Sequence, residues 1–518
     1  MQRRRLLQLA LASASTLWLP RSAWGQTRFD ADPFTLGVAS GSPSHDSLVL
    51  WTRLAPAGQD IDGPVTVRFE LARDEAFKQI VRSGQAQALP ELAHSVHVEA
   101  GGLDPDRWYF YRFFAGDAAS PVGRTRTFPA PDADAARLRL AYASCQRFDH
   151  GYFGAYRHML DESLDAVLFL GDYIYEYPGS PKAVRTPPGG WVVTLDDYRR
   201  RYALHKADAA LQAMHAACPW IVTWDDHEVQ NDYAGLTAGS SGPPVADFAA
   251  RRTAAYQAFY EHMPVRASAL TQAVAGLVHG AETRLYSQLR FGRLANLYLL
   301  DDRQYRGPQV CNPGGATGSS TVMLPECAAL SDPKRTLLGS AQEAWLDAAM
   351  ARSSEGWNIV GQQTLFGPRQ LQAEGRPPAV WNDGWDGYPA ARTRMLDTLA
   401  RRKVPNAVLF GGDVHENWVG RVLADYTDPT SAALGVEFCG TSITSHSSGN
   451  ATLAQRLSNN PHFIFAEAER KGYGVAEFTP QRLTTRLRVV TDVTRPDTGI
   501  ETLAEFHVAA GSARIERA

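Results

Sequence analysis

The chain has 518 residues, which is more than one ordinary hydrophobic core holds, since single cores stop growing at roughly 250 to 300 residues. It carries 52 Lys and Arg against 55 Asp and Glu, for a formal net charge of −3. This mixed, nearly balanced charge excludes the basic stripe of a nucleic-acid-binding protein and the polybasic surface of a membrane-bound one. We therefore expect two domains and no specific nucleic-acid binding.

Residues 1–25 are predicted to be a cleavable export signal. Arginines at positions 3–5 precede an apolar stretch over residues 6–20, and a small-residue cleavage site follows. Consecutive arginines at this place are typical of signals for the twin-arginine (Tat) export machinery, so we expect a periplasmic or secreted protein that is exported folded. The alternative is a membrane anchor, but a span needs about 20 apolar residues and this stretch is shorter. No later segment is apolar enough to cross a bilayer, so we expect no transmembrane segment in the mature chain.

Residues 26–130 have the pattern of an all-β domain. Short strand-like runs at residues 48–54, 65–71, 95–99 and 108–113 are separated by turn residues, and the last run is dense in aromatic side chains. This spacing predicts a small sandwich of immunoglobulin or fibronectin type. A linker rich in Pro, Ala and Asp, from residue 129 to 136, closes the segment.

Residues 137–510 are predicted to form an α/β domain, because strand and helix patterns alternate there. Residues 138–143 are expected to be a strand, residues 152–161 a helix, and residues 166–170 a strand buried on both faces. Residues 195–217 have the spacing of one long amphipathic helix. Further strands are expected at residues 220–224, 294–300, 357–361 and 406–410.

Polar residues follow these strands at the points where they end. Asp172 follows Gly171 after one strand, and Asp413 follows Gly412 after another. One such Asp is often only a turn or helix-capping residue. The recurrence indicates more, because catalytic groups gather at the carboxyl ends of strands in α/β sheets. Together with Asn231 and His415, these residues are what a bridged multi-metal site needs, and phosphate ester hydrolysis is its natural use.

Longer strings of residues carry a specific resemblance. Five of them, in this order, are similar to the motif series of the PhoD-type alkaline phosphatases: Ala143-Ser144-Cys145-Gln146, Gly171-Asp172-Tyr173-Ile174-Tyr175-Glu176, Trp224-Asp225-Asp226-His227-Glu228, Asp301-Asp302-Arg303-Gln304-Tyr305-Arg306 and Gly412-Asp413-Val414-His415. Residues 37–41 and 50–53 resemble that family's N-terminal β-domain. The resemblance covers almost the whole mature chain. It implies a calcineurin-like metallophosphoesterase domain of two sheets flanked by helices, holding one Fe³⁺ and Ca²⁺ ions.

The resemblance also implies a ligand set. The residues that match the family's positions around iron are Cys145, Asp172, Tyr175 and His415, with Asp172 bridging. The residues that match positions near calcium or the bridging region are Asn231 and Asp413. On base rates alone Cys145 would be a buried core thiol, and only its place after a strand, within the motif, favours the ligand interpretation.

Two catalytic roles are expected, each with an alternative. His227 is a candidate general acid toward the leaving oxygen, and a structural hydrogen-bonding role is an equal alternative. Arg303, with Arg306, is a candidate for binding phosphate oxygens, and a salt bridge to Asp301 or Asp302 explains at least one of them equally well.

The predicted activity is hydrolysis of phosphate monoesters, diesters or both, by in-line attack of a metal-bound hydroxide. Cys145 as the nucleophile is disfavoured, because residues 146–149 lack the glycine-rich cradle that binds phosphate. The substrate is expected to be a small phosphate ester or a phospholipid-like molecule. Three alternatives stay open: a phospholipase D-like phosphodiesterase, a non-catalytic exported metal-binding protein, and an oxygenase-type iron enzyme.

The chain has five cysteines, and an odd number in an exported protein leaves at least one thiol unpaired. Cys311 and Cys327 flank a loop rich in Gly, Ser, Thr and Pro, and a disulfide between them is plausible in an exported protein. Cys218 and Cys439 are expected to be small buried hydrophobic residues.

Overall fold

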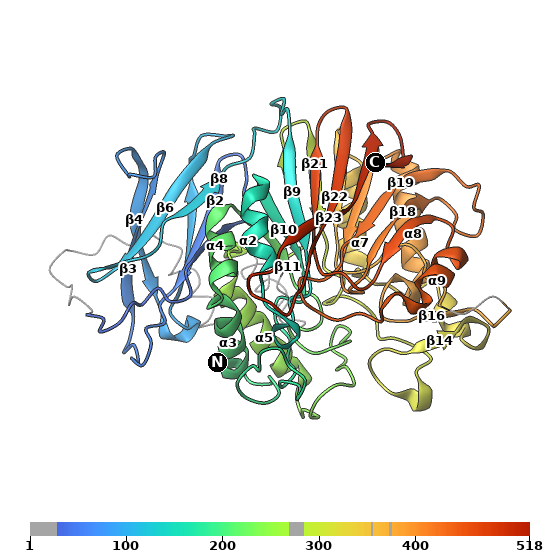
Figure 1. Ribbon diagram of the computed structural model, residues 1–518, viewed down its shortest axis with the longest axis horizontal. Coiled ribbons are helices and arrows are strands. Elements are labelled where there is room, and N and C mark those ends of the chain that lie inside the picture. Colours follow the sequence, from blue (N-terminus) through green and yellow to red (C-terminus); the bar gives the residue numbers. More distant parts are fainter. Residues whose placement is uncertain (1–27, 269–283, 354–355, 372–374) are drawn as a thin grey trace.

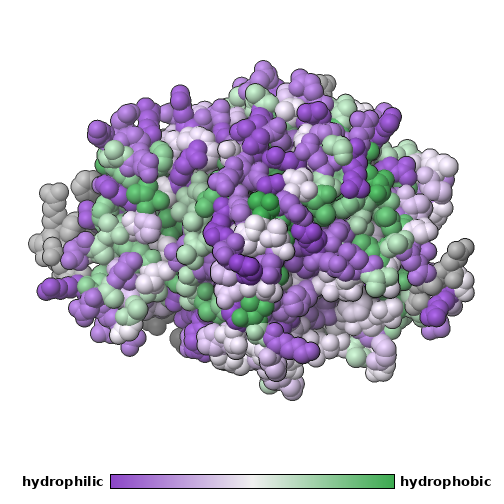
Figure 2. All heavy atoms as spheres, viewed as in Figure 1, coloured by the Kyte–Doolittle hydropathy of each residue, from purple (hydrophilic) through white to green (hydrophobic). Residues whose placement is uncertain are grey.

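The computed structural model describes residues 28–268, 284–353, 356–371 and 375–518. The predicted export signal at residues 1–25 lies outside the described residues. Within the described ranges, no helix is both long and apolar enough to cross a membrane. On the face of the molecule shown in Figure 2, hydrophilic and hydrophobic residues are interspersed.

The N-terminal part is all β, as predicted, and lies at one end of the molecule (Figure 1). Its strands are β1 (Val38–Gly41), β2 (Ser47–Arg53), β3 (Val65–Ala72), β4 (Ile80–Ala88), β5 (Ser95–Gly101), β6 (Trp108–Ala115), β7 (Ala118–Ala119) and β8 (Gly123–Arg126). One sheet has the order β4-β3-β6-β7, with β8 also paired to β6. Its apolar face, including Val67 and Tyr111, packs with Leu50 and Val98 of β2 and β5. The alternation of buried and exposed residues along β3 is the period-two pattern of a half-buried strand.

The other N-terminal strands belong to a larger sheet. Strands β1, β2 and β5 form one end of a ten-stranded sheet of order β24-β23-β22-β21-β9-β10-β11-β1-β2-β5. The junction is a parallel pairing of β1 with β11 (Trp220–Thr223), at Gly41 and Trp220. The N-terminal strands are therefore continuous with the sheet that carries much of the candidate site.

Two large sheets form the centre of the α/β part. The remaining strands of the ten-stranded sheet are β9 (Leu138–Ala143), β10 (Ala166–Leu170), β21 (Gly472–Phe478), β22 (Arg482–Val490), β23 (Ile500–Ala509) and β24 (Ile515–Arg517). The second sheet has the order β12-β13-β15-β17-β19-β18-β20. Its strands are β12 (Ser287–Phe291), β13 (Ala295–Leu299), β15 (Trp357–Gly361), β17 (Ala407–Gly411), β18 (Asn417–Leu423), β19 (Ala433–Cys439) and β20 (Phe463–Glu467).

The two sheets pack face to face, and helices cover their outer faces (Figure 1). Strand β10 is buried on both faces, as predicted: Leu168 and Leu170 belong to the core between the sheets, while Val167 and Phe169 pack under helices. The helices over the first sheet are α2 (Ala155–Met159), α3 (Leu195–Lys206), α4 (Ala209–Ala217) and α5 (Phe248–His262). Those over the second sheet are α7 (Gly339–Met350) and α8 (Pro389–Arg402).

The prediction of one helix over residues 195–217 was wrong. The chain forms α3 and α4 instead, because Asp208 caps the second helix: its side chain accepts the N–H groups of Ala210 and Leu211, at 3.1 and 3.2 Å. The apolar spacing continues across the break, so the hydrophobic pattern alone gives no sign of it.

Smaller elements surround the end of the second sheet. Strands β14 (Thr321–Met323) and β16 (Ala379–Trp381) pair with each other, and helix α9 (Leu453–Asn459) packs near β18 and β20. The structure contains the disulfide between Cys311 and Cys327, close to β14. Cys218 and Cys439 are free and buried, as expected.

Candidate metal centre

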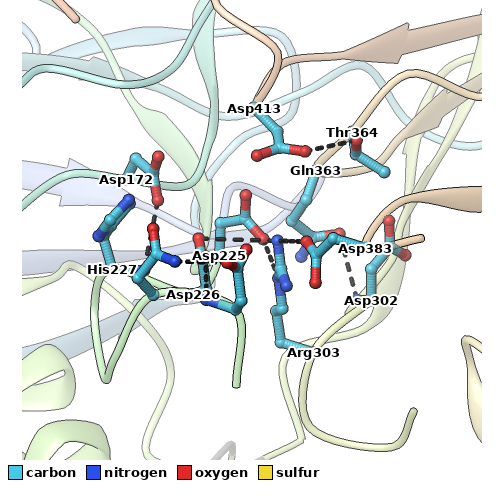
Figure 3. Close-up of polar contacts among 12 residues, drawn as sticks. Asp172, Asp225, Asp226, His227, Asp302, Arg303, Gln363, Thr364, Asp383 and Asp413 are labelled. Atoms are coloured by element: carbon cyan, nitrogen blue, oxygen red, sulfur yellow. Dashed lines mark hydrogen bonds and ion pairs between the residues drawn. The ribbon is translucent and has the colours of Figure 1, made fainter. Parts of the chain in front are cut away.

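The ends of six strands from both sheets meet at one place: β9, β10, β11, β13, β15 and β17. Figure 3 shows the side chains of residues that follow these strands. Cys145, in the loop after β9, donates its backbone N–H to the backbone oxygen of Gly171, in the loop after β10, at 3.1 Å. On the second sheet, Gln363 follows β15 and joins two other loops. Its backbone oxygen accepts the N–H of Gly412, which follows β17, at 2.8 Å. Its side-chain Oε1 accepts the N–H of Asp302, which follows β13, at 3.2 Å. These hydrogen bonds fix the loops relative to one another before any ligand binds.

Four of the predicted ligands have an unusual backbone conformation. Cys145, Asp172, Asp413 and His415 have φ values of 60, 58, 64 and 58°. Few residues other than Gly adopt this left-handed region, and such strain persists at functional sites where the surrounding structure enforces it. The recurrence supports a shared functional role for these four positions.

Glycine precedes both aspartates for a steric reason. A Cβ atom on Gly171, whose φ is +102°, would lie 2.5 Å from Asp225 Cβ, and one on Gly412 would lie 2.3 Å from Ser144 Oγ. Real Cβ atoms are not found at such distances. The Gly-Asp pairs therefore let neighbouring loops approach closely enough to share a site.

The structure brings the four residues expected around iron into contact. Ligand atoms of Cys145, Asp172 and His415 lie within 4.8 Å of one another. The phenol of Tyr175 donates to Asp172 Oδ2 at 2.8 Å and lies 3.2 Å from His415 Nε2. His415 Nδ1 faces the backbone oxygen of His446 at 2.7 Å. Since a carbonyl only accepts, Nδ1 carries the proton and Nε2 is left with a lone pair for a metal.

Burial sets the protonation of this group. It raises the pKa values of Cys145, Asp172 and Tyr175 well above their usual ranges, and neighbouring carboxylates add to the effect. Burial, with a contribution from Lys471, lowers the pKa of His415 to about 3, so its imidazole is neutral. A thiol, a phenol and a carboxyl group held together in a low-dielectric interior need a cation to be charged. Their donor atoms suit a trivalent iron.

A second cluster of carboxylates lies beside the first. Asp225, Asp226 and Asp413 place carboxylate oxygens within 4.8 Å of one another, and so do Asp226, Asp232 and Asp383. Burial raises the pKa of Asp413 to about 6 and that of Asp232 to about 8. Asp225 Oδ2 is buried without a hydrogen-bond partner among the described residues. The excess of carboxylate oxygens fits hard cations such as Ca²⁺.

Arg303 is the cation at the centre of these carboxylates (Figure 3). Its side chain is fully buried and forms ion pairs with Asp225 and with Asp383, the latter at 2.7 Å, and lies 3.6 Å from Asp226. The salt bridges suggested by the sequence, to Asp301 or Asp302, are not the ones that form. Arg303 therefore balances the carboxylates, and its guanidinium has no exposed face.

Comparisons with known proteins identify the family of this chain. The family model described as PhoD-like phosphatase matches residues 140–487, and the model of that family's N-terminal domain matches residues 19–129. The chain belongs to the PhoD-like phosphatases. It is 44% identical to alkaline phosphatase D of Bacillus subtilis (strain 168) over 491 residues, which cover 92% of this chain and 81% of that protein. The solved structure of PhoD matches with a TM-score of 0.87 and 43% identity, over 95% of this chain and 93% of that one. The chain is a phosphoric ester hydrolase.

The two remaining predicted site residues of this PhoD-like phosphatase lie along one edge of the centre. His227 Nδ1 is 2.7 Å from Glu176 Oε2, and a ring nitrogen of His227 lies within 4.8 Å of the Asp172 and Asp226 carboxylates. Burial would lower the pKa of His227, but the carboxylates around it raise it well above its usual value. Asn231 donates its N–H to Glu176 Oε1 at 2.7 Å and its side-chain amide to Asp232 Oδ2 at 2.5 Å.

Sequence reasoning missed several residues of the centre. Asp383 follows the short strand β16, and Asp232 follows Asn231 directly, so an acidic residue after a strand or beside a predicted ligand was the available signal. Glu228 accepts the N–H groups of Tyr173 at 2.6 Å and Asp225 at 2.8 Å and so ties two of the loops together. Glu228 ends the motif Trp224-Asp225-Asp226-His227-Glu228, and the sequence indicated no separate role for it.

Proposed function

We propose that this PhoD-like phosphatase is a metal-dependent enzyme that hydrolyses phosphate monoesters, diesters or both at the carboxyl ends of its central strands. The observation that carries the proposal is the contact of Cys145, Asp172, Tyr175 and His415 beside a buried cluster of carboxylates. A non-catalytic binding protein would not need a thiol, a phenol and an imidazole gathered around one aspartate. The alternative of a phospholipase D-like phosphodiesterase uses the same centre and differs only in the substrate.

The metal ions we propose are Fe³⁺ and Ca²⁺. Cys145, Tyr175 and His415 would hold the iron, Asp172 would bridge, and Asn231 and Asp413 would face calcium. Bound ions would neutralise the phosphate oxygens and lower the pKa of a water molecule, which are the main requirements of phosphoryl transfer.

The chain's own residues take three further roles in this proposal. His227, with Nδ1 held by Glu176, gives the proton on its other ring nitrogen to the leaving oxygen. Arg303 balances the charge of the carboxylates and keeps them in place. Cys145 is a ligand rather than a nucleophile, because it lies against Asp172 and His415 and the residues after it lack the glycine-rich cradle that binds phosphate.

The finer fold and the location are also part of the proposal. We assign the α/β part to the calcineurin-like metallophosphoesterases and the N-terminal part to the immunoglobulin- or fibronectin-like sandwiches. The arginine-rich start of residues 1–25 supports Tat-dependent export to the periplasm or the medium. The disulfide between Cys311 and Cys327 fits an oxidising compartment.

Hydrolysis of an aryl phosphate monoester and an aryl phosphate diester, before and after chelation, tests the proposal. Activity that is lost on chelation and restored by iron with calcium supports it, and the two rates rank the substrate classes. Activity that survives complete removal of metal contradicts the metal-dependent mechanism. A protein that is inert on both esters with its metals in place favours a binding role.

A further inference from the structure

A cavity of about 390 Å³ opens beside the metal centre. Asp413 and His415 line one side of it, so it is continuous with the site of hydrolysis. Its other walls come from β14, β16, α9 and the loops near them, and include Trp381, Arg369 and Arg456. A group bonded to a phosphate at the metal centre therefore has room on this side.

Two arginines give the lining of this cavity positive charge. Arg369 and Arg456 both pair with Glu416, at 2.8 and 3.2 Å. Ser448 Oγ and Trp418 Nε1 also donate to Glu416, at 2.8 and 2.9 Å. Each oxygen of this buried carboxylate therefore accepts two hydrogen bonds. Two guanidinium groups thus share one carboxylate, which leaves one positive charge without a counter-ion in the group.

Arg456 has the spare hydrogen-bonding capacity. Its Nη1 contacts Glu416 and Ser448 at 3.2 Å, its Nε is buried, and its Nη2 has no hydrogen-bond partner within the described part of the chain, on a side chain that is 18% exposed. The nearby Lys471 is already committed, because its Nζ donates to the backbone oxygen of His415 at 2.9 Å and to Ser447 Oγ at 3.1 Å. The guanidinium of Arg456, on the cavity wall, is therefore a group that a ligand anion would meet.

The lining of the cavity is partly apolar. Trp381 lines the cavity and keeps 38% of its surface exposed, and Leu371 and Val414 lie on the same lining. Trp381 pairs with Thr321 across β14 and β16, and the disulfide-linked Cys327 packs beneath these strands. An exposed indole on a braced strand pair is a suitable contact for an aromatic or apolar body.

We propose that this cavity is a specificity subsite for the alcohol part of the ester, and that it selects alcohols with an apolar body and an anionic group at the far end, which Arg456 binds. The inference rests on the proposed hydrolysis at the adjacent centre. It adds a substrate class that the ligand set leaves undefined, since the metal centre recognises only the phosphate.

A matched pair of substrates isolates the charge. 4-Carboxybenzyl phosphate and 4-carbamoylbenzyl phosphate have nearly the same shape and similar leaving alcohols, and differ in one negative charge. The ratio of their kcat/KM values is measured by phosphate release for the wild type, Arg456→Met and Arg456→Lys, with Arg401→Met as a control because Arg401 pairs on the exposed side of α8. Removal of Arg456 leaves Glu416 with Arg369 and two neutral donors, so the substitution does not strand that carboxylate.

The expected result is a preference for the carboxylate in the wild type that falls about tenfold in Arg456→Met, as expected for a hydrogen bond to a charged group. Arg456→Lys keeps part of the preference, and Arg401→Met keeps all of it. Equal kcat/KM values for the two esters in the wild type, or a preference unchanged in Arg456→Met, would contradict the proposal.

Binding of the two corresponding benzylphosphonates to the metal-loaded protein, by calorimetry, gives the same ratio without turnover. If neither ester is hydrolysed but the phosphonates show the Arg456-dependent preference, the proposed function fails and the subsite stands. If the esters are hydrolysed and neither measurement shows the preference, the subsite fails alone. If the protein neither hydrolyses the esters nor binds the carboxylate phosphonate more tightly, both fail.

Discussion

The hydroxyl of Ser445 lies 2.7 Å from the phenol oxygen of Tyr175. It also lies 2.9 Å from the backbone oxygen of Cys145, which already accepts the N–H groups of Thr444 and Ser445 at 3.4 and 3.3 Å. The Ser445 hydroxyl therefore donates a hydrogen bond to the phenol oxygen of Tyr175, and the Tyr175 hydroxyl donates to Asp172. Ser445 thus contacts two of the residues that we expect around iron: its backbone N–H donates to Cys145, and its side chain donates to Tyr175.

Ser445→Ala is expected to weaken the hold on the ion at Tyr175. A hydrogen bond to a charged group contributes about 1.5 to 3 kcal/mol, so metal retention should fall roughly tenfold or more. The measurement is iron content after dialysis against a chelator, together with the visible absorption band of an iron-bound phenolate. Thr444→Val is the control, because that hydroxyl donates to the backbone oxygen of Arg147 and not to a ligand. Equal iron retention and an unmoved band in Ser445→Ala would show that the contact is only structural.

Cys145→Ala is expected to lose iron, and to lose activity in proportion to the iron lost. The reason is that its buried thiol lies within 4.8 Å of ligand atoms of Asp172 and His415. Cys218→Ala is a matched control, since Cys218 is also free and buried but lies in a hydrophobic core. Elemental analysis and phosphate release measure the two effects. A phosphocysteine trapped at Cys145 would overturn the ligand role.

Gly171→Ala is expected to destabilise the protein and distort the centre. The new Cβ would lie 2.5 Å from Asp225 Cβ at a φ of +102°, and strain of this kind costs about 1 to 3 kcal/mol. Thermal unfolding measures the loss. In the control, Gly190→Ala, the added Cβ has open space around it, so its melting temperature should stay close to that of the wild type. A Gly171→Ala protein with unchanged stability and metal content would contradict the close-approach argument.

His97 should make stability depend on pH. Its ring stacks on Tyr260 with centroids 4.3 Å apart, its Nε2 lies 3.0 Å from Met263 O, and burial lowers its pKa from 6.5 to about 4. Between pH about 4 and 6.5 the unfolded chain binds a proton at His97 that the folded chain does not. The contribution of His97 to the free energy of unfolding is therefore fully present above pH about 6.5 and is lost as the pH falls from there to about 4.

Chemical denaturation of wild type and His97→Gln at several pH values measures this contribution. The difference between the two proteins should change by up to about 1.4 kcal/mol per pH unit inside that window and be constant above it. His45→Gln, at an exposed histidine, is the control. Parallel curves for His97→Gln and wild type would refute the assignment.

Local patterns predicted the strands well where a strand is buried along most of its length. Residues 138–143, 166–170 and 357–361 form β9, β10 and β15 with the expected bounds. The Gly-Asp pairs were visible for the same reason, since the end of a buried run is sharp. The break at Asp208 was missed because a capping residue looks like any other polar residue in an amphipathic pattern.

The rest depends on contacts between distant segments. The pairing of β1 with β11 joins Gly41 to Trp220, and the hydroxyl of Ser445 reaches residues 300 and 270 positions away. Asp383 is part of the carboxylate cluster only because β16 and the loop after β13 meet through Arg303. No period or motif within one segment contains this information.

The measurement that tests the central claim most directly is the metal content of the purified protein and of its Asp172→Asn variant. Asp172 groups with Cys145 and His415 on one side and with Asp226, which belongs to the carboxylate cluster, on the other. We therefore predict iron and calcium in the wild type and a loss of both in the variant. Asp104→Asn, at an exposed ion pair with Arg73, should keep both ions. A wild type without metal, or an Asp172→Asn protein that retains iron and calcium in full, would contradict the account.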